Sequence, residues 1–227
     1  LIIFSADLLL LSRIFNIYLR MNTTLRHILF VLIFRPWLRQ IIGIKSINAD
    51  IVNRQEQFII VANHNSHFDT ATLMSNLNQD VFDKTHPIAE IDYFNQTKLL
   101  QFVSSKLLNV KYITKTRLEK KLSTLDILDD LLKKGKSIIL FPEGTRGKPG
   151  ELSEFKSGVA VLLKKNAKIP FIPVFLSGMG NILPKGSRLI LPYNAIAFYG
   201  QPKRINSKKN NDELLKEIKE SIFALDP

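Results

Sequence analysis

The sequence predicts an α/β fold, a mixed and largely parallel central sheet covered by helices, with an apolar helical segment in front of it. Short apolar runs alternate with longer amphipathic runs from about residue 57 onward, as strands and helices alternate in such domains. Polar clusters follow several of the short runs, and open α/β sheets bind ligands beyond the carboxyl ends of their strands. We therefore divide the chain into an N-terminal segment, residues 1–42, and a folded domain, residues 43–227.

The N-terminal segment contains two apolar runs, residues 1–19 and 25–38, each interrupted by charged side chains. A membrane-spanning helix needs about 20 nearly uncharged apolar residues, and neither run meets that requirement. Both resemble helices that lie in the membrane interface with cations toward lipid phosphates. We predict interfacial membrane attachment at this segment; a buried helical pair and a signal-peptide remnant are the alternatives.

The first part of the domain is expected to alternate strands and helices. The expected strands are residues 57–62, 86–90 and 110–114, and the expected helices are residues 70–77, 97–108 and 118–134. In the last of these helices, leucines recur at steps of three and four residues, and Gly135 follows as a stop signal.

The second part continues the alternation. Strands are expected at residues 137–141 and 170–176, followed by a late strand pair at 188–193 and 194–200, and helices at 158–166 and 212–225. The closing helix is expected to take its N-cap from Asn211 or Asp212.

The composition excludes some kinds of site and indicates the kind of partner. Of 227 residues none is cysteine, which excludes disulfides, thiolate nucleophiles and cysteine metal sites. The formal net charge of +12 indicates affinity for an anionic partner. Nucleic acid, an anionic lipid surface and a phosphorylated substrate all fit that charge.

The first polar cluster is the stretch NHNSHFD, residues 63–69. If a helix begins near Ser66, Asp69 in its first turn can face back to His64. A carboxylate on one imidazole nitrogen fixes the tautomer and leaves the other nitrogen as a base. No serine or cysteine nucleophile accompanies the pair, which suggests a base that deprotonates a substrate hydroxyl. A metal site of His64, His67 and Asp69 and a polar turn remain alternatives.

Two further clusters offer anion-binding groups. FPEGTRG, residues 141–147, combines a tight turn with Glu143 and Arg146, and an arginine fork suits phosphate. Glu143 could accept a hydrogen bond from a substrate hydroxyl or hold that arginine. The expected strand at 110–114 is followed by Lys115 and Arg117, which we also expect to bind phosphate.

These clusters, in this order, resemble the motifs of the glycerolipid acyltransferase family. Its first motif, Asn-His-x-x-x-x-Asp, is matched by Asn63, His64 and Asp69, and its third motif is matched by residues 141–146 without exception. FKSG and IPFIPVFLSG, residues 155–158 and 169–178, resemble later blocks. The second motif departs from the family pattern because Lys115 stands where arginine is usual, which keeps the cation but not the planar fork.

The resemblance implies an O-acyltransferase of the 1-acylglycerol-3-phosphate type, which would make residues 43–227 an acyltransferase domain. His64, oriented by Asp69, would activate the free hydroxyl of a lysophospholipid, and acyl-CoA or acyl carrier protein would donate the acyl group. No cofactor or metal would be needed. The substrate-binding residues implied are Lys115, Arg117, Glu143, Gly144, Thr145 and Arg146.

The same resemblance implies phosphatidic acid as the product, a role in phospholipid biosynthesis, and a membrane-associated enzyme at the cytoplasmic face. The basic charge then requires no nucleic-acid partner. Another lysophospholipid or glycerol phosphate acceptor is an alternative within the family. A metal-dependent hydrolase and a non-catalytic basic module that binds lipid surfaces are alternatives from other classes.

Overall fold

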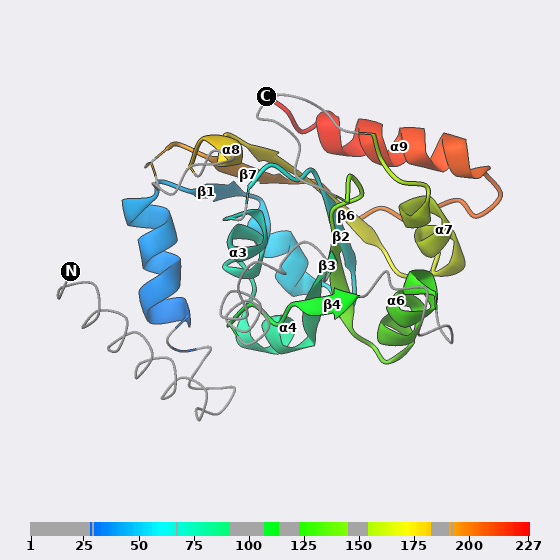
Figure 1. Cartoon of the computed structure of the whole chain (residues 1–227), viewed down its shortest axis with the longest axis horizontal. Helices are drawn as coiled ribbons and strands as arrows, with labels where there is room; N and C mark the ends of the chain where they lie inside the picture. The colour runs from blue at the N-terminus through cyan, green and yellow to red at the C-terminus, as the bar shows by residue number, and fades with distance from the viewer. Residues whose placement is uncertain are drawn as a thin grey trace, which may run out of the picture.

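The computed structural model describes residues 28, 30–66, 68–90, 107–113, 123–144, 154–182, 191 and 193–227. Seven strands form one sheet in the order β1-β7-β6-β2-β5-β3-β4 (Figure 1). The strands are β1 Lys45–Ile47, β2 Ile59–Ala62, β3 Thr85–Glu90, β4 Lys111–Ile113, β5 Ser137–Leu140, β6 Phe171–Ser177 and β7 Ile196–Tyr199.

Helices connect and cover these strands. The helical elements are η1 Phe30–Phe34, η2 Trp37–Ile41, η3 Ala49–Arg54, α3 Phe68–Met74, α4 Gln79–Lys84, α6 Thr124–Lys133, α7 Gly158–Lys165, α8 Met179–Ile182 and α9 Asn211–Phe223. The mixed α/β architecture expected from the sequence is confirmed.

The direction of the strands decides where a site can form. β6, β2, β5, β3 and β4 are mutually parallel, while β7 pairs antiparallel with β6, and β1 is parallel to β7. The carboxyl ends of β2 and β5, which are neighbours in the sheet, therefore lie at the same edge. The segments that follow them begin at Asn63 and Phe141, so the first and third motifs meet there.

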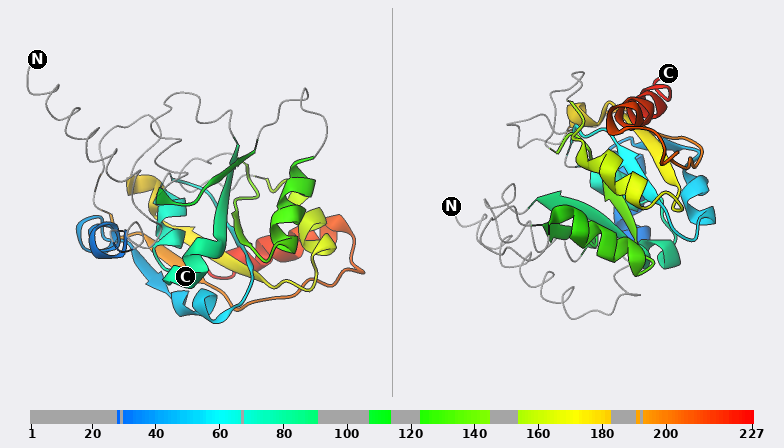
Figure 2. Two further views of the ribbon diagram at one scale, coloured as in Figure 1. Left: turned by 90° about the horizontal axis from the view of Figure 1, so that it is seen from below. Right: turned by 90° about the vertical axis from the view of Figure 1, so that its right-hand side faces the viewer.

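Alternate side chains of the buried strands point to opposite faces, as the pleat requires. On β2, Ile60 and Ala62 pack in one core with the N-terminal helical turns and α3. Ile59 and Val61 pack in a second core under α6, α7 and α9. Figure 2 shows these three helices together on one side of the sheet.

The helix boundaries follow capping signals. α6 begins at a capping box of Ser123 and Asp126, and the chain leaves it through Gly135, whose φ is +73°. α9 begins at a second capping box formed by Asn210 and Glu213. The expected N-cap at Asn211 or Asp212 was wrong by one residue, because Asn210 is the extended residue whose side chain accepts the Glu213 N–H.

The N-terminal helical turns have one buried and one exposed face. Phe30 and Leu38 are each 1% exposed and belong to the first core, whereas Leu32 and Ile33 are 67% and 64% exposed. This short segment therefore has apolar side chains both in the core and on the surface, and its attachment to a membrane stays a prediction. Within the described ranges, no helix has the length and apolar character needed to cross a membrane.

Several expected elements fall wholly or partly outside the residues that the structure describes. Residues 1–27, most of the expected helix at 97–108, the start of the helix at 118–134 and most of the strand at 188–193 lie outside the described residues. The sequence did not indicate β1, η3, α4 or α8, which are short.

Candidate active site

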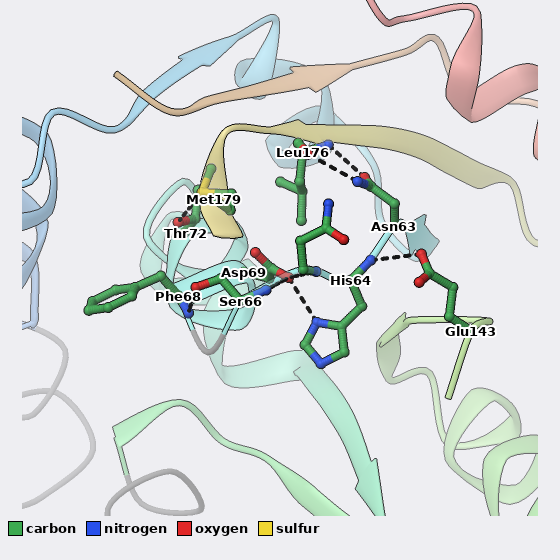
Figure 3. Close-up of polar contacts among 10 residues, drawn as sticks. Asn63, His64, Ser66, Phe68, Asp69, Thr72, Glu143, Leu176 and Met179 are labelled. Carbon is green, nitrogen blue, oxygen red and sulfur yellow. Dashed lines mark hydrogen bonds and ion pairs between the residues drawn. The ribbon is translucent and has the colours of Figure 1, made fainter. Parts of the chain in front are cut away.

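His64 follows the carboxyl end of β2, and Asp69 lies in the first turn of α3. The two side chains contact each other at this edge of the sheet. The Nδ1 atom of His64 lies 2.8 Å from Oδ2 of Asp69 (Figure 3). Asp69 is the second residue of α3 and fully buried, so the first turn of this helix faces back toward the strand end. The His–Asp geometry expected from the sequence is present.

Backbone donors fix the Asp69 carboxylate. Its Oδ2 atom also accepts the N–H groups of Asn65 and Ser66, at 2.7 and 2.8 Å. An ionised carboxylate only accepts hydrogen bonds, so the contact with the imidazole assigns the proton to Nδ1 of His64. The Nε2 atom, which points away from Asp69 in Figure 3, is then the nitrogen available to accept a proton.

The turn after β5 supports His64 in two ways. The ring of Phe141 stacks on the imidazole, with centroids 4.2 Å apart and an interplanar angle of 22°. The Oε1 atom of Glu143, a buried side chain, accepts the backbone N–H of His64 at 3.0 Å. Backbone and ring of His64 are thus both held by the third motif.

Asn63 fixes the end of β2 from the other side. Its side-chain Nδ2 donates to the carbonyl of Leu176 at 2.9 Å, and its Oδ1 accepts the Leu176 N–H at 2.7 Å. An amide side chain can supply one donor and one acceptor in this way, so it continues the β2–β6 pairing one residue beyond the strand. The catalytic candidate His64 therefore follows an anchored residue.

Gly144 closes the turn at the end of β5. Its N–H donates to the Phe141 carbonyl at 3.0 Å, and its φ of +73° lies in the left-handed region, which glycine adopts without steric cost. The turn brings Glu143 to the backbone of His64, a contact that the sequence did not indicate.

The remaining predicted site residues are Lys115, Arg117, Thr145, Arg146 and the alternative metal ligand His67, and all of them lie outside the described residues. Among the described residues, no group of three His, Cys, Asp or Glu side chains could hold a metal ion. His67 lies outside the described residues, so the alternative metal site of His64, His67 and Asp69 is left to experiment.

The structure assigns positions to three residues whose roles the sequence left open. Asn63 and Phe141 stood in the motifs, but only the fold shows that one pairs with β6 and the other stacks on the base. The third is Lys156, whose ammonium lies against Gly144. Lys156 belongs to FKSG, residues 155–158, which resembles a later block of the family, but that resemblance assigned the lysine no role.

Comparison with known proteins shows the family of the chain. A model of the acyltransferase family matches residues 43–177, more than half of the chain. The chain belongs to the acyltransferase family, whose first and third motifs are the segments that meet at the ends of β2 and β5.

Individual relatives share one description. A probable 1-acyl-sn-glycerol-3-phosphate acyltransferase of Mycoplasma pneumoniae is 29% identical over 150 residues, which cover 63% of this chain and 54% of the relative. A chloroplastic 1-acyl-sn-glycerol-3-phosphate acyltransferase of Brassica napus, BAT2, is 43% identical over 67 residues, 30% of this chain and 19% of the relative. The matched regions thus span about half or less of these two relatives.

A solved structure has the same fold. The 1-acyl-sn-glycerophosphate (LPA) acyltransferase PlsC from Thermotoga maritima superposes with a TM-score of 0.65 and 22% sequence identity. The likeness covers 84% of this chain and 73% of that protein, so it includes most of the described sheet and helices.

Proposed function

We propose that the protein is an O-acyltransferase that moves a fatty acyl group from a thioester donor to the free hydroxyl of a lysophospholipid. The acceptor that best fits the relatives' descriptions is 1-acylglycerol-3-phosphate, which would give phosphatidic acid. The single observation that carries the chemistry is the 2.8 Å contact between His64 Nδ1 and the buried carboxylate of Asp69.

The reaction can be written with this pair as the only proton carrier. Nε2 of His64 takes the proton from the acceptor hydroxyl while the oxygen of that hydroxyl attacks the thioester carbonyl. Asp69 stabilises the imidazolium that forms. When the tetrahedral intermediate collapses, the carbon–sulfur bond breaks and the imidazolium returns the proton to the departing thiol. No acyl-enzyme forms, and the two substrates bring both reacting groups, so the scheme requires no cofactor.

Glu143 and Phe141 act on the base in this proposal. Glu143 holds the backbone N–H of His64, and the Phe141 ring restricts rotation of the imidazole, so Nε2 stays directed at the acceptor hydroxyl. Donors to the oxyanion of the tetrahedral intermediate would lower the barrier further.

Phosphate binding is assigned by position in the chain. Lys115 and Arg117 follow β4, and Thr145 and Arg146 follow the turn at the end of β5. β4 and β5 are parallel members of one sheet, so the carboxyl ends of these two strands lie at the edge that carries His64. We assign the acceptor phosphate to these cations.

Membrane attachment is proposed at the exposed face of the N-terminal helical turns. Leu32, Ile33 and Ile41 are between 59% and 67% exposed there, and exposed apolar side chains beside cations suit the interface of an anionic membrane. A lysophospholipid acceptor resides in that interface. The cytoplasmic face is proposed as the location because the thioester donors are made in that compartment.

An acyl-transfer assay tests the proposal. The purified chain is mixed with vesicles containing 1-acylglycerol-3-phosphate, other lysophospholipids or glycerol 3-phosphate, each with acyl-CoA or acyl carrier protein as donor. Formation of phosphatidic acid is the expected result. Chelator-sensitive hydrolysis of the lipid without transfer would instead favour a metal-dependent hydrolase.

A further inference from the structure

The side chain of Lys156 occupies the space that any side chain at residue 144 would need. A Cβ atom added to Gly144 would lie 2.0 Å from Nζ and 2.5 Å from Cε of Lys156, far closer than two heavy atoms can approach. The terminal half of the lysine therefore lies directly against the backbone of Gly144.

The backbone of Lys156 is bound to the same turn. Its N–H donates to the carbonyl of Pro142 at 2.9 Å. Main chain and side chain of one residue thus contact the turn of residues 141–144 at two points. The backbone bond keeps Lys156 at the turn, and its ammonium lies beside Gly144. The residue as a whole is exposed to solvent.

That turn is the one that positions the base. Phe141 stacks on the imidazole of His64. Glu143, the neighbour of Gly144, accepts the backbone N–H of His64 (Figure 3). A cation fixed on this turn lies at the same edge of the sheet as the His–Asp pair. The opposite end of β6 carries lysines too, but they are separated from the base by the length of the strand.

We propose that the ammonium of Lys156 binds a phosphate group of a substrate. The inference rests on the acyltransferase function proposed above and adds to it a substrate-binding residue within the described structure. A phosphate monoester carries close to two negative charges near neutral pH, and an ammonium is a compact donor for it. The phosphate of the acceptor and the phosphates of coenzyme A share this chemistry.

The test is Lys156→Met, which keeps the length and apolar stem of the side chain and removes its charge. Lys168→Met is the matched control, because Lys168 is an exposed lysine next to the amino end of β6, at the opposite edge of the sheet. Thermal unfolding of both variants shows whether each is folded. We expect kcat/KM with 1-acylglycerol-3-phosphate and acyl-CoA to fall about 10- to 100-fold in Lys156→Met and to stay within about twofold in the control.

Two substrate changes identify the phosphate. If Lys156 binds the acceptor phosphate, the penalty disappears when monoacylglycerol replaces 1-acylglycerol-3-phosphate. If it binds the donor phosphates, the penalty disappears when an S-acyl-N-acetylcysteamine replaces acyl-CoA. Either outcome supports the proposal. Lys156→Arg should retain most of the activity, since it keeps a cation of similar reach.

Other outcomes overturn it. An equal penalty with every acceptor and donor would mean that Lys156 only shapes the turn that holds Glu143, and no penalty at all would mean that it has no part in the reaction. Both results presuppose an active wild type. If the wild type transfers no acyl group to any acceptor, the proposed function itself fails, and that result is distinct from a wild type whose activity is insensitive to Lys156.

Discussion

His64 and Asp69 are joined by a hydrogen bond of 2.8 Å between Nδ1 and a carboxylate oxygen that also accepts two backbone N–H groups. The backbone bonds come from the residues between the two, so the loop is wrapped around the carboxylate. The position of Asp69 is consequently independent of substrate, and the imidazole is oriented before any ligand binds. This preorganisation is the feature on which the proposed proton transfers depend.

Asp69→Asn should reduce turnover without unfolding the protein. The amide oxygen can still accept the two backbone N–H groups, but the variant lacks the charge that stabilises the imidazolium. We expect kcat to fall about 10²- to 10⁴-fold with a small change in Tm. Asp80→Asn is the matched control, because Asp80 is an exposed aspartate in the first turn of the short helix α4. Equal activity in both variants would contradict the role of Asp69.

Asn63→Ala should destabilise the fold as well as the site. The substitution leaves the buried N–H and carbonyl of Leu176 without the amide partner, and each unsatisfied buried group costs about 1–3 kcal/mol. Urea unfolding should show a loss of about 2–4 kcal/mol. Asn65→Ala provides the control, since Asn65 serves Asp69 through its backbone N–H, which alanine retains. A loss below about 0.5 kcal/mol in Asn63→Ala would show that water replaces the amide.

Acid should weaken the packing of α6 on α7. Asp129 contacts Lys133 at 2.7 Å, Lys165 at 3.1 Å and the Asn166 amide at 3.1 Å. The bond from Lys133 is the largest cause that lowers the pKa of Asp129 from 3.8 to about 2. Because the pKa is lower in the folded chain, the contribution to stability is complete above about pH 4 and is lost as the pH falls toward 2.

The acid effect is measured by urea unfolding of the wild type and Asp129→Asn between pH 2 and 5. The stability difference between them should be largest near pH 5 and shrink as the pH falls. Asp130→Asn, which removes an exposed carboxylate paired with Lys134, is the control and should change stability little. A pH-independent difference for Asp129→Asn would refute the assignment.

The exposed apolar face of the N-terminal turns should mediate attachment to vesicles. The double substitution Leu32→Glu and Ile33→Glu places two charges at positions where the native residues are 67% and 64% exposed, so the fold should persist. Binding to vesicles that contain anionic phospholipid should fall at least about tenfold, as burial of two large aliphatic side chains is lost. Leu38→Glu is the contrasting variant, because Leu38 is buried and its loss should lower Tm. Undiminished vesicle binding by the double variant would place the attachment elsewhere.

The sequence alone predicted much of the sheet, because buried strands such as residues 59–62 and 137–140 are continuous apolar runs. It also predicted the His64–Asp69 pair, since their spacing across a helix start is local. Contacts between segments distant in the chain were not predictable: the bidentate pairing of Asn63 with Leu176 and the bond from His64 to Glu143 depend on which strands become neighbours. The short β1 carries too few residues for a periodic pattern, and its place in the sheet comes from pairing with β7.

The central claim is that Nε2 of His64 is the base that activates the acceptor hydroxyl. The most direct measurement is single-turnover acyl transfer to 1-acylglycerol-3-phosphate by the wild type and by His64→Ala, with acceptor binding measured on the same samples. The account predicts that the rate falls at least about 100-fold while acceptor affinity changes less than about threefold and chelators leave the wild type active. A His64→Ala protein that retains more than about a tenth of the wild-type rate would contradict it.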